Sequence, residues 1–165
     1  MILNTYKHCL DRISQDDIDK LKSIIDSYQD IIILGNGGSN AISCHIAEDY
    51  TKALGKRALC FGDSARMSCY ANDYGWDNAY TKFIEHFAVK NTLVILISSS
   101  GNSQNILNAA EYCLGKHPII TLSGFSETNK LNIRYSKEAL INFYVSSTDY
   151  GIVECLHELI LHSII

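Results

Sequence analysis

The sequence predicts an α/β fold, a doubly wound three-layer α/β/α sandwich around a five-stranded parallel sheet. Five short apolar runs alternate along the chain with longer segments of helical periodicity, and this alternation is typical of a parallel sheet with crossover helices. Nearly all of the runs are continuously apolar, as expected of strands that helices bury on both faces. In such folds ligands bind at the carboxyl ends of the strands, where loops lead into helices.

Each predicted element has its own local signal. The apolar runs, each followed by small or polar residues, predict strands at Ile31–Leu34, Arg57–Phe61, Thr92–Ser98, Pro118–Leu122 and Leu140–Val145. A leading segment up to about Gln29 has a helical pattern, with Ser14 before two acidic residues as its N-cap. Apolar positions at helical spacing predict further helices at Ser39–Leu54, Asp77–Lys90, Ser103–Leu114 and about Tyr150–Ile165.

Length and composition limit the classes of protein that remain. The 165 residues predict one domain, in which residues 1–29 form a leading helical segment and residues 30–165 form the sheet and its flanking helices. An apolar fraction of 47% and a net charge of −4 exclude a disordered chain. The slightly acidic balance offers no basic surface to nucleic acid or to an anionic membrane, so neither is expected as a partner.

The cysteines and the first residues indicate a cellular location. Six scattered cysteines form no Cys-x-x-Cys pair, which argues against a zinc ribbon or a thioredoxin-type redox motif. The start of the chain lacks the basic and long apolar regions of a secretory leader, and the apolar runs are too short to cross a bilayer. We therefore expect a cytoplasmic protein with reduced thiols.

Two loops that follow predicted strands have an unusual composition. Gly35–Asn40 contains three glycines before a helix, so its backbone can approach a ligand closely and present free N–H groups to an anion. Ser98–Ser103 places four hydroxyls at one helix N-terminus, where a plain cap needs one. Hydroxyl and amide donors without lysine or arginine suit a phosphate monoester. Each loop alone also fits a tight structural turn with a serine cap.

Other phosphate-binding motifs fit these loops less well. A P-loop needs a lysine before its final serine or threonine, and neither loop has one. The dinucleotide-binding fingerprint needs glycine where Asn40 stands. Asp63 follows the second predicted strand, where an acidic ligand to a ribose could lie. A nicotinamide or flavin enzyme therefore stays as an alternative, although it leaves the serine-rich loop unexplained.

Histidines and carboxylates on two predicted helices provide candidate catalytic groups. His45 and Asp49 are four residues apart and share one helix face, which suits two ligands of one metal or a base with its orienting partner. Glu154 and His162 are two turns apart and could converge on a ligand beside their helix. Two imidazoles and two carboxylates form a reasonable zinc ligand set. For His157 we expect a packing or capping role, and for Glu48 and Glu158 we expect solvated charges.

Together these residues resemble the sugar isomerase (SIS) domain family, in particular its phosphoheptose isomerase branch. The resemblance rests on the glycine-rich loop, the serine-rich loop and a histidine-bearing C-terminal helix, and it extends from about Asp30 to the end of the chain. Three further segments support this branch of the family, namely His45–Asp49, Ala71–Gly75 and Val153–His157 together with His162.

The resemblance implies a homotetramer with active sites between subunits and assigns roles to individual residues. It implies contacts with a sugar phosphate from Asn36, Gly37, Gly38, Ser39, Asn72, Asp73, Ser98, Ser99, Ser100, Ser103 and Glu154. It implies one divalent metal ion, often zinc, at His45, Asp49, Glu154 and His162, with Asp49 and His162 as the acid and base. Two positions depart from better-known members, because aspartate stands at 49 in place of glutamate and glutamate at 154 in place of glutamine. The added charge at 154 should tighten a cation and oppose a developing enediolate.

The function that the resemblance implies is an aldose–ketose isomerase. Its substrate would be sedoheptulose 7-phosphate and its product D-glycero-D-manno-heptose 7-phosphate, formed through an enediol with no nucleotide cofactor and used as a heptose precursor of bacterial surface polysaccharide. Members of the family also serve as non-catalytic phosphosugar sensors or as protein-binding tetramers, including one that binds a replication initiator. This alternative stays open, although the candidate catalytic groups favour the enzyme.

Overall fold

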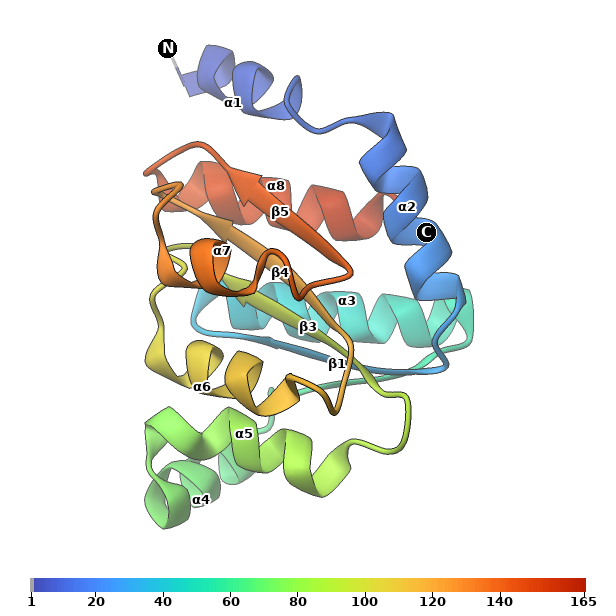
Figure 1. Ribbon diagram of the computed structural model, residues 1–165, viewed down its shortest axis with the longest axis vertical. Helices are drawn as coiled ribbons and strands as arrows, with labels where there is room; N and C mark the ends of the chain where they lie inside the picture. Colours follow the sequence, from blue (N-terminus) through green and yellow to red (C-terminus); the bar gives the residue numbers. More distant parts are fainter. Residues whose placement is uncertain (1) are drawn as a thin grey trace.

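A five-stranded sheet lies at the centre of the computed structural model, which describes residues 2–165 (Figure 1). The strands are β1 (Asp30–Gly35), β2 (Arg57–Cys60), β3 (Leu93–Ser98), β4 (Ile119–Gly124) and β5 (Ile141–Val145). They are ordered β2-β1-β3-β4-β5, and every neighbouring pair is parallel. The predicted fold class and all five predicted strands are confirmed.

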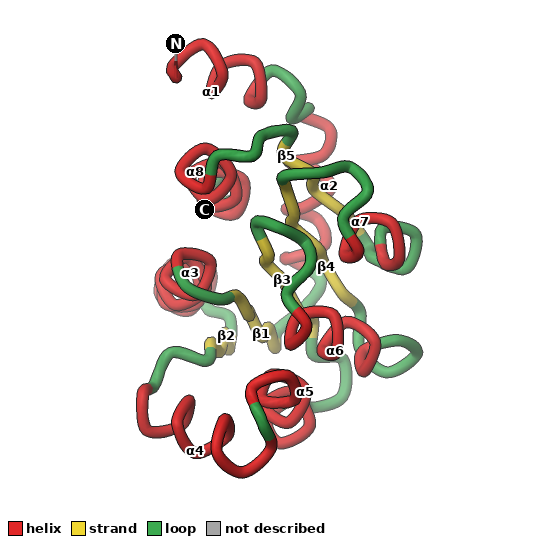
Figure 2. Tube along the Cα trace, turned by 90° about the vertical axis from the view of Figure 1, so that its left-hand side faces the viewer, coloured by secondary structure: helices red, strands yellow, loops and turns green. Residues whose placement is uncertain are grey.

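Helices cover both faces of this sheet. They are α1 (Ile2–Leu10), α2 (Gln15–Asp26), α3 (Gly38–Leu54), α4 (Ser64–Tyr74), α5 (Trp76–Phe87), α6 (Gln104–Cys113), α7 (Lys130–Tyr135) and α8 (Tyr150–His162). Figure 2 shows α3 and α8 on one side of the sheet and α6 and α7 on the other. Within residues 2–165, no helix combines the length and the apolar character that crossing a membrane requires.

Alternate side chains of each central strand pack into two separate hydrophobic cores, because successive side chains of a strand point to opposite faces of the sheet. Ile31 and Ile33 of β1 pack into the core under α2, α3 and α8, whereas Ile32 and Leu34 pack into the core under α5, α6 and α7. The strands are therefore continuously apolar, as the sequence indicates.

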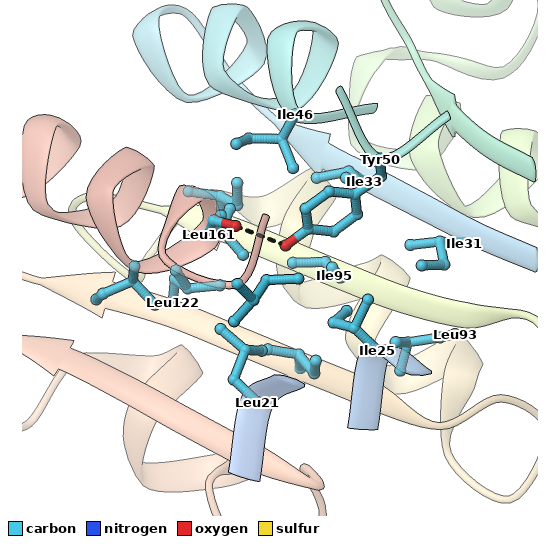
Figure 3. Packing of buried hydrophobic residues seen from close by; sticks show 14 of the residues in the cluster. Leu21, Ile25, Ile31, Ile33, Ile46, Tyr50, Leu93, Ile95, Leu122 and Leu161 are labelled. Carbon is cyan, nitrogen blue, oxygen red and sulfur yellow. Dashed lines mark hydrogen bonds between the residues drawn. The ribbon is translucent and has the colours of Figure 1, made fainter. Parts of the chain in front are cut away.

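The core under α3 and α8 fixes the relative position of these two helices. In Figure 3 the ring of Tyr50 lies among aliphatic side chains and its hydroxyl points toward α8. This buried hydroxyl donates a hydrogen bond of 2.9 Å to the carbonyl oxygen of Leu161. An unpaired buried hydroxyl would be costly, so this bond favours one particular alignment of the helices. The same alignment brings their polar faces together.

The structure differs from the predicted elements in three respects. The leading segment forms two helices, and Ser14 caps the second by accepting a hydrogen bond from the Asp17 amide, as predicted for that residue. Helices α4 and α7 were not predicted. Helix α4 has no buried residue, so it lacks the apolar stripe on which the prediction depends. Asp63 caps α4 by accepting from the Arg66 amide, and this role explains its position without a ribose.

Candidate active site

A cavity of about 420 Å³ lies at the carboxyl ends of β1 and β3. These strands are neighbours, and the chain leaves them toward opposite faces of the sheet through α3 and α6, which is the usual ligand position in such sheets. The cavity is lined by Asn36, Gly37, Gly38, Ser39, Ser98, Ser99, Ser100, Ser103, Tyr150 and Glu154. The structure thus brings both predicted loops into one cavity. Tyr150, the first residue of α8, was not predicted to lie there.

Hydrogen bonds from the second core hold the glycine-rich loop in place. Gly37 has a φ of 55°, a conformation that side chains disfavour, and it precedes the first turn of α3. The side-chain amides of Asn36 and Asn105 donate to each other's oxygen at 2.8 and 2.9 Å, which joins the loop to α6. The buried Tyr80 hydroxyl donates to the carbonyl oxygen of Gly35. Neither Tyr80 nor Asn105 was predicted to support the site, because their partners lie far away in sequence.

The serine-rich loop leaves hydrogen-bond donors free for a ligand. Ser103 is the N-cap of α6, yet its side chain makes no capping hydrogen bond. Instead its hydroxyl accepts from Ser98 at 3.2 Å. The hydroxyls of Ser39 and Ser99 are 3.5 Å apart, so the N-termini of α3 and α6 face the same space. Two helix N-termini and several hydroxyls offer an anion hydrogen bonds and favourable dipoles without a formal positive charge.

Glu154 lies in this cavity and was predicted as both a substrate contact and a metal ligand. Its Oε1 accepts a long hydrogen bond of 3.5 Å from Ser99. Gly38 makes room for it, because a Cβ atom at position 38 would lie 2.2 Å from Glu154 Oε2. Among residues 2–165, Glu154 is the only carboxylate that lines the cavity, and it points at the serine-rich loop.

A second cluster of polar side chains joins α3 to α8. Asp49 Oδ2 lies 3.2 Å from His45 Nε2 and 3.0 Å from His162 Nε2. The two imidazole rings meet edge to face, with centroids 4.9 Å apart. One potential ligand atom from each of these three residues lies within 4.8 Å of the others. We call His45, Asp49 and His162 the α3–α8 triad.

Asp49 is held in its ionised form by its neighbours. The hydrogen bond from His162 lowers the pKa of Asp49 below its usual value of 3.8, and the charges of His45 and Lys52 act in the same direction against a partial loss of hydration. The carboxylate is therefore available as a metal ligand or proton acceptor at neutral pH.

The triad fits a divalent cation such as zinc. Two imidazoles and a carboxylate are a common set of three protein ligands in zinc sites, and such sites leave a further position for water or substrate. The His45 side chain is 55% exposed, so the open side of the triad faces solvent. Glu154 is not part of this group among the described residues, so the predicted set of four ligands is not assembled within one chain.

The cavity and the triad are connected along α8. Glu154, Glu158 and His162 follow at intervals of four residues, so they lie along one helix face over about 12 Å. A second cavity between α3 and α8 is bordered by Gly38 and Glu154, which also line the first, and by His45 and Glu158. Glu154 and His162 do not meet within one chain, because eight residues of α8 separate them. A ligand that contacts both would extend between them, so their convergence on one ligand stays a prediction.

The structure corrects the expectation for Glu158 and confirms the one for His157. Glu158 is not simply a solvated charge, because its Oε1 lies 2.9 Å from His45 Nδ1. His157 packs inside the protein as expected, and its Nε2 donates to the carbonyl oxygen of Ser123 at 3.1 Å.

Asn72 and Asp73 lie apart from the cavity of their own chain. Both are exposed on α4, where the Asn72 amide donates to Asp73 Oδ1 at 2.9 Å. Neither lines the cavity at the two loops. The structure of the single chain thus does not bring these two predicted substrate contacts to the other predicted residues.

Phosphoheptose isomerases are among the known proteins that are similar to this chain. No protein-family model matches the chain. It is 30% identical over 151 residues to phosphoheptose isomerase of Fusobacterium nucleatum, a match covering 88% of this chain and 76% of the relative. A match of 34% identity to the Histophilus somni phosphoheptose isomerase covers 57% of this chain and only 51% of that relative. The solved structure of phosphoheptose isomerase from Neisseria gonorrhoeae has the same fold, with a TM-score of 0.86 at 21% identity over 98% of this chain and 89% of that one.

Proposed function

The chain belongs to the phosphoheptose isomerase family, and on this premise we propose that it interconverts sedoheptulose 7-phosphate and D-glycero-D-manno-heptose 7-phosphate. The observation that carries this proposal is the position of the loop cavity relative to the triad. Glu154 lines the loop cavity and His162 belongs to the triad, and these two residues lie on one polar face of α8, eight positions or about 12 Å apart along the helix. An extended sugar phosphate bound along this face would therefore reach from the loops toward the triad.

The phosphate would bind at the two loops. Hydroxyls of Ser99, Ser100 and Ser103 and free amides at the start of α3 and α6 would surround its oxygens. Binding energy from this remote group would orient the carbonyl end of the sugar and so lower the barrier for the reaction at carbons 1 and 2. Glu154, which lies between the loops and the triad, would accept hydrogen bonds from sugar hydroxyls.

The proton would be moved by Asp49 and His162. One of them removes the proton from the carbon next to the carbonyl group, and the other returns a proton to the resulting enediol. Their mutual hydrogen bond of 3.0 Å supports an exchange of protons between them. No electrons leave the substrate, so the reaction needs no nucleotide cofactor.

A divalent ion such as zinc, held by His45, Asp49 and His162, would polarise the carbonyl oxygen of the sugar. The ion's preference for nitrogen and oxygen ligands matches the three ligand atoms that lie within 4.8 Å of one another. Glu154, the fourth residue predicted for this ligand set, would then contact the sugar and not the ion.

We further infer that the protein assembles as a homotetramer in the cytoplasm and that the active site is completed by a neighbouring subunit. Asn72 and Asp73, exposed on α4, would contribute to the cavity of another chain. The six cysteines are all free, which is compatible with a reducing compartment. Light scattering coupled to size-exclusion chromatography would measure the assembly, and a monomeric active enzyme would contradict this inference.

The activity is tested by hydrogen exchange with solvent. The purified protein is incubated with sedoheptulose 7-phosphate and zinc in deuterated water, and the products are followed by NMR. An enediol route incorporates deuterium at carbon 2 of the aldose and at carbon 1 of the recovered ketose. The absence of both product and exchange would refute the proposal.

Replacement of His162 by glutamine separates an enzyme from a non-catalytic sugar phosphate sensor. Glutamine can still donate a hydrogen bond to Asp49 but cannot transfer a proton. We expect kcat to fall by about 10²-fold or more, whereas the dissociation constant for sugar phosphate, measured by calorimetry, changes little. An unchanged kcat would remove His162 from the mechanism.

A further inference from the structure

Glu158 makes a contact that the proposed function does not use. It lies on α8 one turn before His162, and its Oε1 is 2.9 Å from Nδ1 of His45 on α3. The other ring nitrogen of His45, Nε2, faces Asp49 Oδ2 at 3.2 Å. The imidazole of His45 is thus held between two carboxylates that approach it from opposite edges.

The contact with Glu158 favours one of the two tautomers of a neutral His45 imidazole. A neutral imidazole has one N–H donor and one acceptor nitrogen, and an ionised carboxylate only accepts. Glu158 lies nearer to its ring nitrogen than Asp49 does, so this contact favours hydrogen on Nδ1. The lone pair of Nε2 then points toward Asp49 and His162, which is the orientation that a metal ligand requires.

We propose that Glu158 is a positioning residue for the metal site: it fixes the tautomer and the ring orientation of His45, so that Nε2 is preorganised to bind a divalent cation. A hydrogen bond from the free nitrogen of a metal-bound histidine to a carboxylate has this effect in metal sites generally. Helix α8 therefore supplies one ligand, His162, and one turn earlier the residue that orients a ligand on α3. This inference rests on the proposed metal site.

Cobalt binding provides the first test, since Co²⁺ enters zinc sites and its visible spectrum reports the ligands. The dissociation constant for Co²⁺ is measured by titration for the wild type, Glu158→Ala, Glu158→Gln and Glu48→Ala. Loss of a carboxylate that orients a metal-bound histidine weakens metal binding by about 10–100-fold, and this is expected for Glu158→Ala. Glu158→Gln keeps an oxygen that accepts from Nδ1, so a smaller loss is expected. Glu48, exposed one turn along α3 without a polar side-chain contact in residues 2–165, is the matched control and should bind Co²⁺ like the wild type.

The tautomer of His45 provides a second test that does not depend on metal or on activity. In the metal-free protein labelled with ¹⁵N-histidine, at a pH where imidazoles are neutral, long-range ¹H–¹⁵N spectra identify the protonated nitrogen. The wild type and Glu48→Ala should show hydrogen on Nδ1 of His45, and Glu158→Ala should lose this preference. Thermal unfolding confirms that each variant is folded.

Three results would overturn this inference. They are wild-type Co²⁺ affinity in folded Glu158→Ala, an Nε2–H tautomer of His45 in the wild type, and failure of the wild type to bind Co²⁺ or Zn²⁺. The isomerase assay on the same wild-type preparation distinguishes these results from failure of the proposed function. If the wild type is active and any of the three results is found, the proposed function stands and only the role of Glu158 is refuted.

Discussion

His157 should make the stability of the protein depend on pH between about 4 and 6.5. Its side chain is completely buried, and burial lowers the pKa of His157 from 6.5 to about 4, against the opposing effect of its hydrogen bond to the Ser123 carbonyl. Its other nitrogen, Nδ1, has no hydrogen-bond partner within residues 2–165, so a proton added there would find no acceptor. In the unfolded chain the same imidazole is hydrated and binds protons at its ordinary pKa.

The sign and size of the effect follow from linkage between protonation and folding. Below pH 6.5 the imidazole of His157 is protonated in the unfolded chain but stays neutral in the folded protein. The free energy of unfolding therefore falls as the pH is lowered and levels off near pH 4. A pKa difference of one unit corresponds to about 1.4 kcal/mol, so the full effect of His157 is about 3 kcal/mol. Between pH 7 and about pH 5 the expected loss is about 2 kcal/mol.

The assay compares the wild type with His157→Gln by urea denaturation at a series of pH values. Glutamine can donate to the Ser123 carbonyl but does not titrate, so the difference in unfolding free energy between the two proteins should change by about 2 kcal/mol from pH 7 to about pH 5. His8→Gln, at an exposed position on α1, is the control and should keep the wild-type pH dependence. A chelator is present throughout, and the protein concentration is constant because assembly shifts apparent stability.

Parallel pH profiles for the wild type and His157→Gln would refute this reasoning. They would mean that the imidazole has the same proton affinity in the folded and unfolded protein, and hence that it is hydrated in solution. A profile in which the wild type gains stability on acidification would be equally contradictory.

Two further substitutions test the construction of the loop cavity. Ser103→Ala removes a hydroxyl that makes no capping bond, so the unfolding free energy should change little. If this hydroxyl donates to the phosphate, KM for the sugar phosphate should rise by about tenfold or more. An unchanged KM in steady-state kinetics would exclude that contact. Tyr80→Phe removes the buried hydroxyl that donates to the Gly35 carbonyl, and it should lower the unfolding free energy by about 1–3 kcal/mol; denaturation curves that coincide with the wild type would show that the bond contributes nothing.

Much of the fold could be predicted from local sequence because strands buried on both faces leave a strong signal. Most of the five strands contain a continuous apolar run, and each strand lies in the structure within a residue or two of its predicted bounds. The glycine-rich and serine-rich loops could also be located from local sequence, because their glycines and serines gather between a strand and the helix that follows it. Helices α4 and α7 escaped prediction, because α4 buries no side chain and α7 is only six residues long.

The sequence alone also supplied most residues of the candidate site, namely the two loops and the histidines and carboxylates of α3 and α8. The tertiary structure decided which of these side chains contact one another. Glu154 and Glu158 are both glutamates on the same helix face, yet one points at Ser99 and the other at His45. The difference is set by the axial alignment of α3 and α8, which depends on core packing and on the bond from Tyr50 to Leu161. Contacts between residues more than a hundred positions apart leave no periodic pattern in the sequence, because only the packed helices determine which side chains meet.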